Sequence, residues 1–166
     1  GGGAPLTLVP PVRVRDLLRL ACSRFAAAPL CFGHGQHDAW EEAQALVLGG
    51  LGLPWEHAGV LLDAQLLPDE VERLLGWIEA RVARRVPAAY LTGRARFAQL
   101  DFEVDERVLV PRSPIGELLV EGLQPWLGDR EPARLLDLCC GSGCIGIAAL
   151  LHLGGTRLAL ADVSAD

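Results

Sequence analysis

Apolar residues in the first part of the chain recur at the spacing of amphipathic helices. Over residues 12–28 they return every three or four positions, which predicts a helix with one buried face. Asp38, followed three residues later by Glu41, has the pattern of a capping box and predicts the start of a second helix. That helix is predicted to run to the pair Gly49-Gly50, because glycine commonly marks the end of a helix.

A third helix with one apolar face is predicted to begin at Pro68-Asp69. Its apolar residues are Val71, Leu74, Leu75, Ile78 and Val82. Pro87 ends this helix, because proline lacks a backbone N–H and its ring clashes with the preceding turn. Residues 1–86 are therefore predicted to form a small helical domain.

The pattern changes from helical to alternating after residue 87. Apolar and acidic residues alternate over residues 100–104, which predicts a half-buried strand. A second apolar run, residues 108–110, follows across a short polar turn. The two runs together predict a β-hairpin over residues 96–110, and residues 87–112 are interpreted as a hairpin linker.

The last part of the chain alternates between predicted helices and strands. We predict an α/β fold in which residues 113–166 form the first part of a Rossmann-like domain. Two parallel strands and one crossover helix cannot cover both faces of a sheet, so this domain is expected to be incomplete here. The predicted elements are a helix at 114–127, a strand at 134–138, a helix at 144–153 and a strand at 157–162.

A glycine-rich turn between the strand at 134–138 and the following helix is the strongest functional signal. Gly141 and Gly143 allow a tight turn and a close approach of backbone to a ligand. The helix that begins near Cys144 points its free N–H groups toward the same place. Asp162 ends the next strand, where a carboxylate accepts hydrogen bonds from ribose hydroxyls. The turn therefore predicts a nucleoside-containing ligand, the alternative being a plain strand-turn-helix corner.

Two classes of ligand compete for this turn. Gly141, Gly143 and Gly146 match the dinucleotide pattern G-x-G-x-x-G, a weak signal alone. Asp137, at the end of the first strand, would repel a pyrophosphate. The same carboxylate suits S-adenosylmethionine, which has no phosphate and carries an ammonium and a sulfonium. S-adenosylmethionine is the predicted cofactor, and a nucleotide-dependent oxidoreductase is the alternative.

These segments together resemble the protein glutamine methyltransferases. The resemblance rests on the run from Pro87 to Gly93, on Phe97, on the run from Val108 to Arg112, and on residues 137–146. Ser113-Pro114-Ile115-Gly116-Glu117 replaces the acidic motif of the branch that acts on release factors. It resembles the branch that modifies the third protein of the large ribosomal subunit. So do Ser23-Arg24-Phe25, Phe32-Gly33-His34-Gly35 and Trp40-Glu41-Glu42-Ala43.

The resemblance implies a function and a set of site residues. It implies a bacterial, cytoplasmic methyltransferase whose residues 1–86 recognise the substrate, a large-subunit ribosomal protein, with release factors as the alternative substrate. It implies that Cys139, Gly141, Gly143 and Phe97 lie at the methyl donor, where the charge argument also places Asp137. It further implies that Asp162 holds the ribose and that Pro111 and Arg112 form a substrate-side loop. The family's Asn-Pro-Pro-Tyr loop, which holds the amide, is absent from these residues and is expected beyond Asp166. No catalytic residue is therefore assigned, and the chain alone is expected to be inactive.

Charge and composition narrow the range of partners. The net charge of −6 argues against electrostatic binding of nucleic acid by the whole chain. One arginine cluster is a candidate RNA contact, although a solvated helix end is the simpler interpretation. Its members are Arg81, Arg84, Arg85, Arg94 and Arg96. A non-catalytic module that docks on a ribosomal protein or its RNA therefore remains an alternative.

The cysteines and the hydropathy of the chain predict its cellular compartment and whether it binds a metal or spans a membrane. The five cysteines are odd in number and form no C-x-x-C pair, which favours reduced thiols in the cytoplasm. Cys31, His34 and His37 fit no common zinc-finger spacing, so no metal is predicted. No run of about 18 uncharged apolar residues occurs, so no membrane span is predicted. Every basic residue is arginine, which indicates a GC-rich genome.

Overall fold

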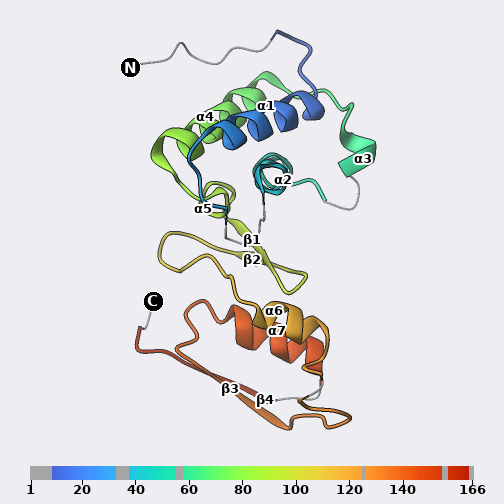
Figure 1. Ribbon diagram of the computed structural model, residues 1–166, viewed down its shortest axis with the longest axis vertical. Coiled ribbons are helices and arrows are strands. Elements are labelled where there is room, and N and C mark those ends of the chain that lie inside the picture. The colour runs from blue at the N-terminus through green and yellow to red at the C-terminus, as the bar shows by residue number, and fades with distance from the viewer. Residues whose placement is uncertain (1–8, 33–37, 55–57, 125, 155–156, 165–166) are drawn as a thin grey trace. The chain divides into compact units, whose positions relative to one another are not determined.

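The chain folds into two compact units, residues Gly1–Thr92 and Gly93–Asp166. The computed structural model describes residues 9–32, 38–54, 58–124, 126–154 and 157–164. The first unit is helical and the second combines helices with two small sheets (Figure 1). The mixed α/β character predicted from the sequence is confirmed, whereas the predicted domain limits stay a prediction.

The first unit is built on three amphipathic helices whose apolar faces meet in one core. α1 and α4 lie side by side and α2 packs against both (Figure 1). Phe25, Leu46 and Ile78 are completely buried where the three helices meet. The three predicted helices are confirmed, and two short helices, α3 and α5, were not predicted. The bounds are α1 Val14–Ala27, α2 Ala39–Leu51, α3 Ala58–Leu61, α4 Pro68–Arg84 and α5 Ala88–Thr92.

The start of α2 follows the prediction, but its end does not. The Asp38 carboxylate caps the helix by accepting from the N–H groups of Trp40 and Glu41, both at 2.9 Å. The predicted stop at Gly49-Gly50 is wrong, because the helix continues to Leu51 and ends at Gly52 with φ 66°. Gly50 serves packing instead: a Cβ there would lie 2.6 Å from the Trp77 ring, so α4 lies too close for any side chain.

The second unit begins with a β-hairpin whose pairing differs from the prediction. β1 (Arg94–Phe97) pairs antiparallel with β2 (Leu100–Glu103), and residues 108–110 lie outside the strands. Ala98 and Gln99 form the turn with φ 47° and 63°, the positive values of the turns that hairpins favour. The partner strand therefore precedes the alternating run. Neither turn residue is glycine or asparagine, so the usual sequence signal of such a turn is missing.

The remainder of the second unit is a β-α-β unit. β3 (Arg134–Leu138) pairs parallel with β4 (Arg157–Ala161), and α7 (Cys144–Leu153) connects them and packs on both. α6 (Ile115–Val120) packs on α7 (Figure 1). It is shorter than the predicted 114–127, because Gly122 and Leu123 take positive φ values and break the helix.

Only one face of the β3–β4 sheet is covered by the described helices. Leu158 and Leu160 on β4 meet α7 at Gly146. On β3, Leu136 and Leu138 alternate with the half-buried residues and are 59% and 66% exposed. This bare apolar face agrees with the prediction that one helix and two strands cannot cover a sheet.

Candidate functional site

The turn between β3 and α7 has a backbone that few side chains tolerate. Cys139, Gly141 and Gly143 all have positive φ, at 58°, 52° and 74°. A Cβ at Gly141 would meet nothing within 4 Å, so open space lies beside this part of the backbone. Cys139 is not glycine, and the left-handed conformation costs it about 1 kcal/mol. Such strain is characteristic of functional turns.

The side chain of Asp137, a residue of β3, lies at the N-terminal end of α7. Its Oδ2 atom accepts a hydrogen bond of 2.8 Å from the N–H of Gly146, in the first turn of the helix. A Cβ at Gly146 would lie 2.7 Å from Leu160 and 3.0 Å from this carboxylate oxygen. Gly146 therefore lets the helix lie against the strands, and Asp137 stabilises the positive end of the helix dipole.

Asp162 fastens the turn to the end of β4. Its Oδ2 atom accepts from the N–H of Gly141 at 2.8 Å, and its Oδ1 atom accepts from the N–H of Ser164 at 3.0 Å. The N–H of Cys140 donates to the Ala161 carbonyl at 3.2 Å. The N–H groups of Ser164 and Gly141 lower the pKa of Asp162, so an exposed carboxylate stays ionised beside the glycine turn.

The cysteines around the turn differ in exposure. Cys144 is buried, burial raises its pKa, and its Sγ lies 3.0 Å from the Ser142 hydroxyl. It is therefore a neutral packing residue, whereas Cys139 is exposed. Among the described residues, no group of three or more His, Cys, Asp or Glu side chains is placed to hold a metal. His34 and His37 of the rejected zinc pattern lie outside the described residues.

Phe97, Pro111 and Arg112 are not joined to the turn by any hydrogen bond or ion pair among the described residues. Phe97 is 6% exposed, and its ring would lie 3.0 Å from a Cβ at Gly116. Its ring packs in the core of the second unit, beside Phe102 at a centroid distance of 6.5 Å. Pro111 is buried and Arg112 is exposed. Their roles at the donor and the substrate stay predictions.

Arg81 corrects the predicted arginine cluster. The residue is 4% exposed, its Nε donates to Glu42 at 2.6 Å, and its Nη2 donates to the Cys31 carbonyl at 3.2 Å. A guanidinium that is buried and ion-paired cannot contact RNA, so this part of the prediction is wrong. The other four arginines are exposed, and RNA contact through them stays a prediction.

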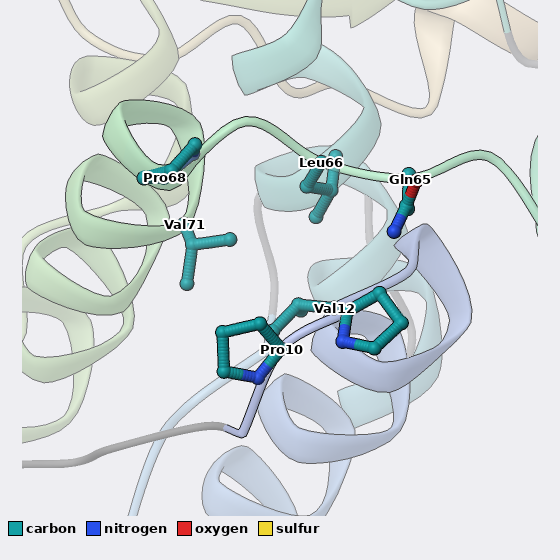
Figure 2. A pocket seen from close by; sticks show the side chains of 7 residues that line it. Pro10, Val12, Gln65, Leu66, Pro68 and Val71 are labelled. Atoms are coloured by element: carbon teal, nitrogen blue, oxygen red, sulfur yellow. The ribbon is translucent and has the colours of Figure 1, made fainter.

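A cavity with an apolar lining lies in the described part of the helical unit (Figure 2). Its volume is about 540 Å³, and Gln65 is the one polar side chain among the described residues that line it. The cavity has no charged or nucleophilic group, so it offers no chemistry of its own. The other lining residues are Pro10, Pro11, Val12, Leu66, Pro68 and Val71. Over the part of the chain that the structure describes, each helix is too short or too polar to cross a membrane.

The chain is similar to known proteins that share one name. No protein-family model matches the chain. The ribosomal protein uL3 glutamine methyltransferase of Bordetella pertussis is 51% identical over 154 residues, which are 92% of this chain and 52% of the relative. The chain is similar to ribosomal protein uL3 glutamine methyltransferases. The enzyme of that name from Xanthomonas campestris is 55% identical over 133 residues, 80% of this chain and 43% of the relative.

The similarity to uL3 glutamine methyltransferases confirms the resemblance seen in the motifs. The relative from Neisseria meningitidis serogroup B is 47% identical over 154 residues, 92% of this chain and 51% of the relative. The chain spans about half the length of the curated relatives it matches. The names of these relatives are those of the ribosomal-protein branch. The motif at residues 113–117 resembles the same branch.

Sequence reasoning missed two features of the site. Gly146 was considered only as part of a dinucleotide pattern, and its close packing on Leu160 depends on tertiary contact. The second feature is Ser164, whose N–H donates a hydrogen bond to Asp162. The signal was present, because an aspartate that binds a backbone N–H two residues later is a common local turn.

Proposed function

We propose that this chain carries the S-adenosylmethionine-binding part of a cytoplasmic enzyme that methylates a glutamine amide in ribosomal protein uL3. The names of its relatives and the glycine turn after β3 support this function. The proposal includes a Rossmann-like sheet in which β3 and β4 are neighbouring strands. A release factor is the alternative substrate, and a non-catalytic ribosome-binding module is the alternative function.

The observation that carries the choice of cofactor is the hydrogen bond from Gly146 to Asp137. A dinucleotide places its pyrophosphate at the N-terminus of this helix, where free N–H groups bind it. Here the Asp137 carboxylate already accepts a hydrogen bond of 2.8 Å from one of those N–H groups, and it places a negative charge at the same end of the helix. A second anion would be repelled. S-adenosylmethionine brings no phosphate, and its ammonium and sulfonium are attracted to Asp137.

The residues of the turn fit the remaining parts of the donor. Asp162 is exposed, and each of its carboxylate oxygens has a further lone pair, so ribose hydroxyls can donate to it while it still holds Gly141. The open space beside Gly141 lets the ligand approach the backbone. Cys139 and Gly143 complete the proposed lining of the donor site.

The proposed reaction depends on holding the amide. An amide nitrogen is a poor nucleophile, because its lone pair is delocalised into the carbonyl. S-adenosylmethionine supplies a methyl group on a positively charged sulfur. The enzyme's task is to place the amide nitrogen in line with that methyl group, so that the N–C bond forms as the S–C bond breaks and the donor leaves as a neutral thioether. The nitrogen gives up one proton to water, and the site stabilises the charge that develops before this loss. The residues of this chain bind and orient the donor in this scheme, and the groups that hold the amide are not assigned.

The cofactor assignment is tested by calorimetry on the complete gene product with S-adenosylmethionine. Asp162→Ala should weaken binding by about tenfold or more, because hydrogen bonds to a charged group contribute about 1.5–3 kcal/mol each. The matched control is Asp105→Ala, which removes another exposed aspartate of the same unit, paired with Arg107 at 2.6 Å. The control should bind normally. Unchanged affinity in Asp162→Ala, or tight binding of NADH by the wild type, would overturn the assignment.

The substrate assignment needs a separate experiment. The complete gene product is incubated with labelled S-adenosylmethionine and either uL3 or a release factor, and modified peptides are identified by mass spectrometry. Methylated glutamine is expected in uL3 alone. Preferential methylation of the release factor would move the protein to the sister branch. Donor binding without methylation of either substrate would favour the non-catalytic module.

A further inference from the structure

An ion pair between Glu42 and Arg81 is buried inside the helical unit. Glu42 is 2% exposed and Arg81 is 4% exposed, and the Nε and Oε1 atoms are 2.6 Å apart. The pair joins the first turn of α2 to the last turn of α4. Burying two charges costs several kcal/mol per ion before their attraction offsets it, and well-packed apolar residues commonly replace such a pair without loss of stability. A gain in stability therefore gives little reason for the pair.

Arg81 makes a second hydrogen bond that apolar packing cannot reproduce. Its Nη2 donates to the backbone carbonyl of Cys31 at 3.2 Å. Cys31 belongs to the stretch that follows α1, and its neighbours Leu30 and Phe32 pack on the core. One guanidinium from α4 thus holds both the start of α2 and the stretch around Cys31, with a planar fork of donors suited to two acceptors.

The residues that α4 holds lie in or next to the motifs that resemble the ribosomal-protein branch of the family. Glu42 lies in Trp40-Glu41-Glu42-Ala43, and Cys31 directly precedes the motif that begins at Phe32. Arg24, in the third motif, donates to Glu79 of α4 at 2.8 Å, two residues before Arg81. Trp40, in the same first turn as Glu42, is 46% exposed. Tryptophan is among the residues most enriched at the centres of protein–protein interfaces.

We infer that Arg81 is a positioning residue for the protein substrate. It fixes the Cys31 backbone and the first turn of α2 in one arrangement, so that the side chains exposed there meet the substrate without a cost of ordering. Fixing a binding surface in advance lowers the entropy lost on association. The inference rests on the proposed function, because it assigns substrate recognition to the helical unit.

The test separates this role from stability by removing the charges and keeping the volume. The double variant Glu42→Leu/Arg81→Met of the complete gene product lacks both buried charges and the bond to Cys31. The matched control is Arg13→Gln/Asp63→Asn, which removes an ion pair of the same unit whose side chains are 50% and 62% exposed and leaves Arg81 intact. Melting temperatures near that of the wild type are expected for both, because an apolar replacement of a buried pair is commonly neutral.

The kinetic readout is methyl transfer to uL3. The buried-pair variant should raise KM for uL3 about tenfold, the rise expected when the arrangement that binds uL3 is populated only about a tenth of the time. Its affinity for S-adenosylmethionine should not change, and the control variant should keep the wild-type KM. A stable buried-pair variant with wild-type KM would overturn the substrate role.

A second readout needs no catalysis. Amide hydrogen exchange in residues 29–32 should accelerate in the buried-pair variant and stay at the wild-type rate in the control. Unchanged exchange would overturn the claim that Arg81 fixes this stretch. If the wild-type protein methylates no uL3 at all, the proposed function fails together with the substrate role. The exchange experiment then still decides whether Arg81 positions the backbone.

Discussion

Two glycines inside helices of the first unit should respond in opposite ways to the same substitution. Alanine is favoured over glycine in a helix by about 1 kcal/mol. A Cβ at Gly76 would meet nothing within 4 Å, so Gly76→Ala should stabilise the unit by about 0.5–1 kcal/mol. A Cβ at Gly50 would lie 2.6 Å from Trp77 and 2.7 Å from Leu74.

The neighbours of Gly50 have little room to move. Leu74 is completely buried, and the Trp77 ring lies under the Arg73 guanidinium, 5.8 Å from the ring centroid. Overpacking of this kind costs about 1–3 kcal/mol. After the gain of about 1 kcal/mol in helix propensity, Gly50→Ala should destabilise the unit by about 1 kcal/mol. The two variants should therefore differ by about 2 kcal/mol.

Urea denaturation at 25 °C measures this difference. The 166-residue chain is used in a Trp126→Phe background, so that all tryptophan fluorescence comes from residues 1–92. The midpoint should fall for Gly50→Ala and rise for Gly76→Ala, with the same dependence on urea in both. Equal stabilisation by the two substitutions would refute the claim that the close approach of α4 requires glycine at position 50.

Two further predictions concern the reactivity of the cysteines and the ionisation of Asp162. Iodoacetamide at pH 8 should label the exposed thiols of Cys31 and Cys139 well before Cys144, because burial raises the pKa of Cys144. Peptide mass spectrometry measures the order, and equal labelling of Cys144 would contradict its burial. The pKa of Asp162 is lowered by the N–H groups of Ser164 and Gly141. Its carboxylate should therefore stabilise the folded turn above the ordinary aspartate pKa and lose this effect as the pH falls through its lower folded-state pKa. An NMR titration that gives a normal or raised pKa for Asp162 would show that these hydrogen bonds are not formed in solution.

The sequence by itself determined the elements whose signals are local. β3 and α7 have the predicted limits, residues 134–138 and 144–153, because an apolar strand, a glycine turn and an apolar helix follow one another without interruption. The cap at Asp38 is equally local, since its partners lie two and three residues away. The candidate site was predictable for the same reason. Asp137, Gly141 and Gly143 lie within seven residues of one another, and Asp162 ends the next strand.

Only the tertiary structure decided what depends on contacts between distant segments. Gly50 has the local signal of a helix end, yet Trp77 of another helix requires it inside α2. The run at residues 100–104 was predicted to pair with residues 108–110, whereas the turn at Ala98 and Gln99 pairs it with the strand that precedes it. Arg81 stands in an arginine-rich stretch that predicts a solvated surface, but Glu42, 39 positions earlier, pairs with it in the core. Periodicity shows which face of an element is apolar, whereas the identity of its neighbours follows only from how the elements pack.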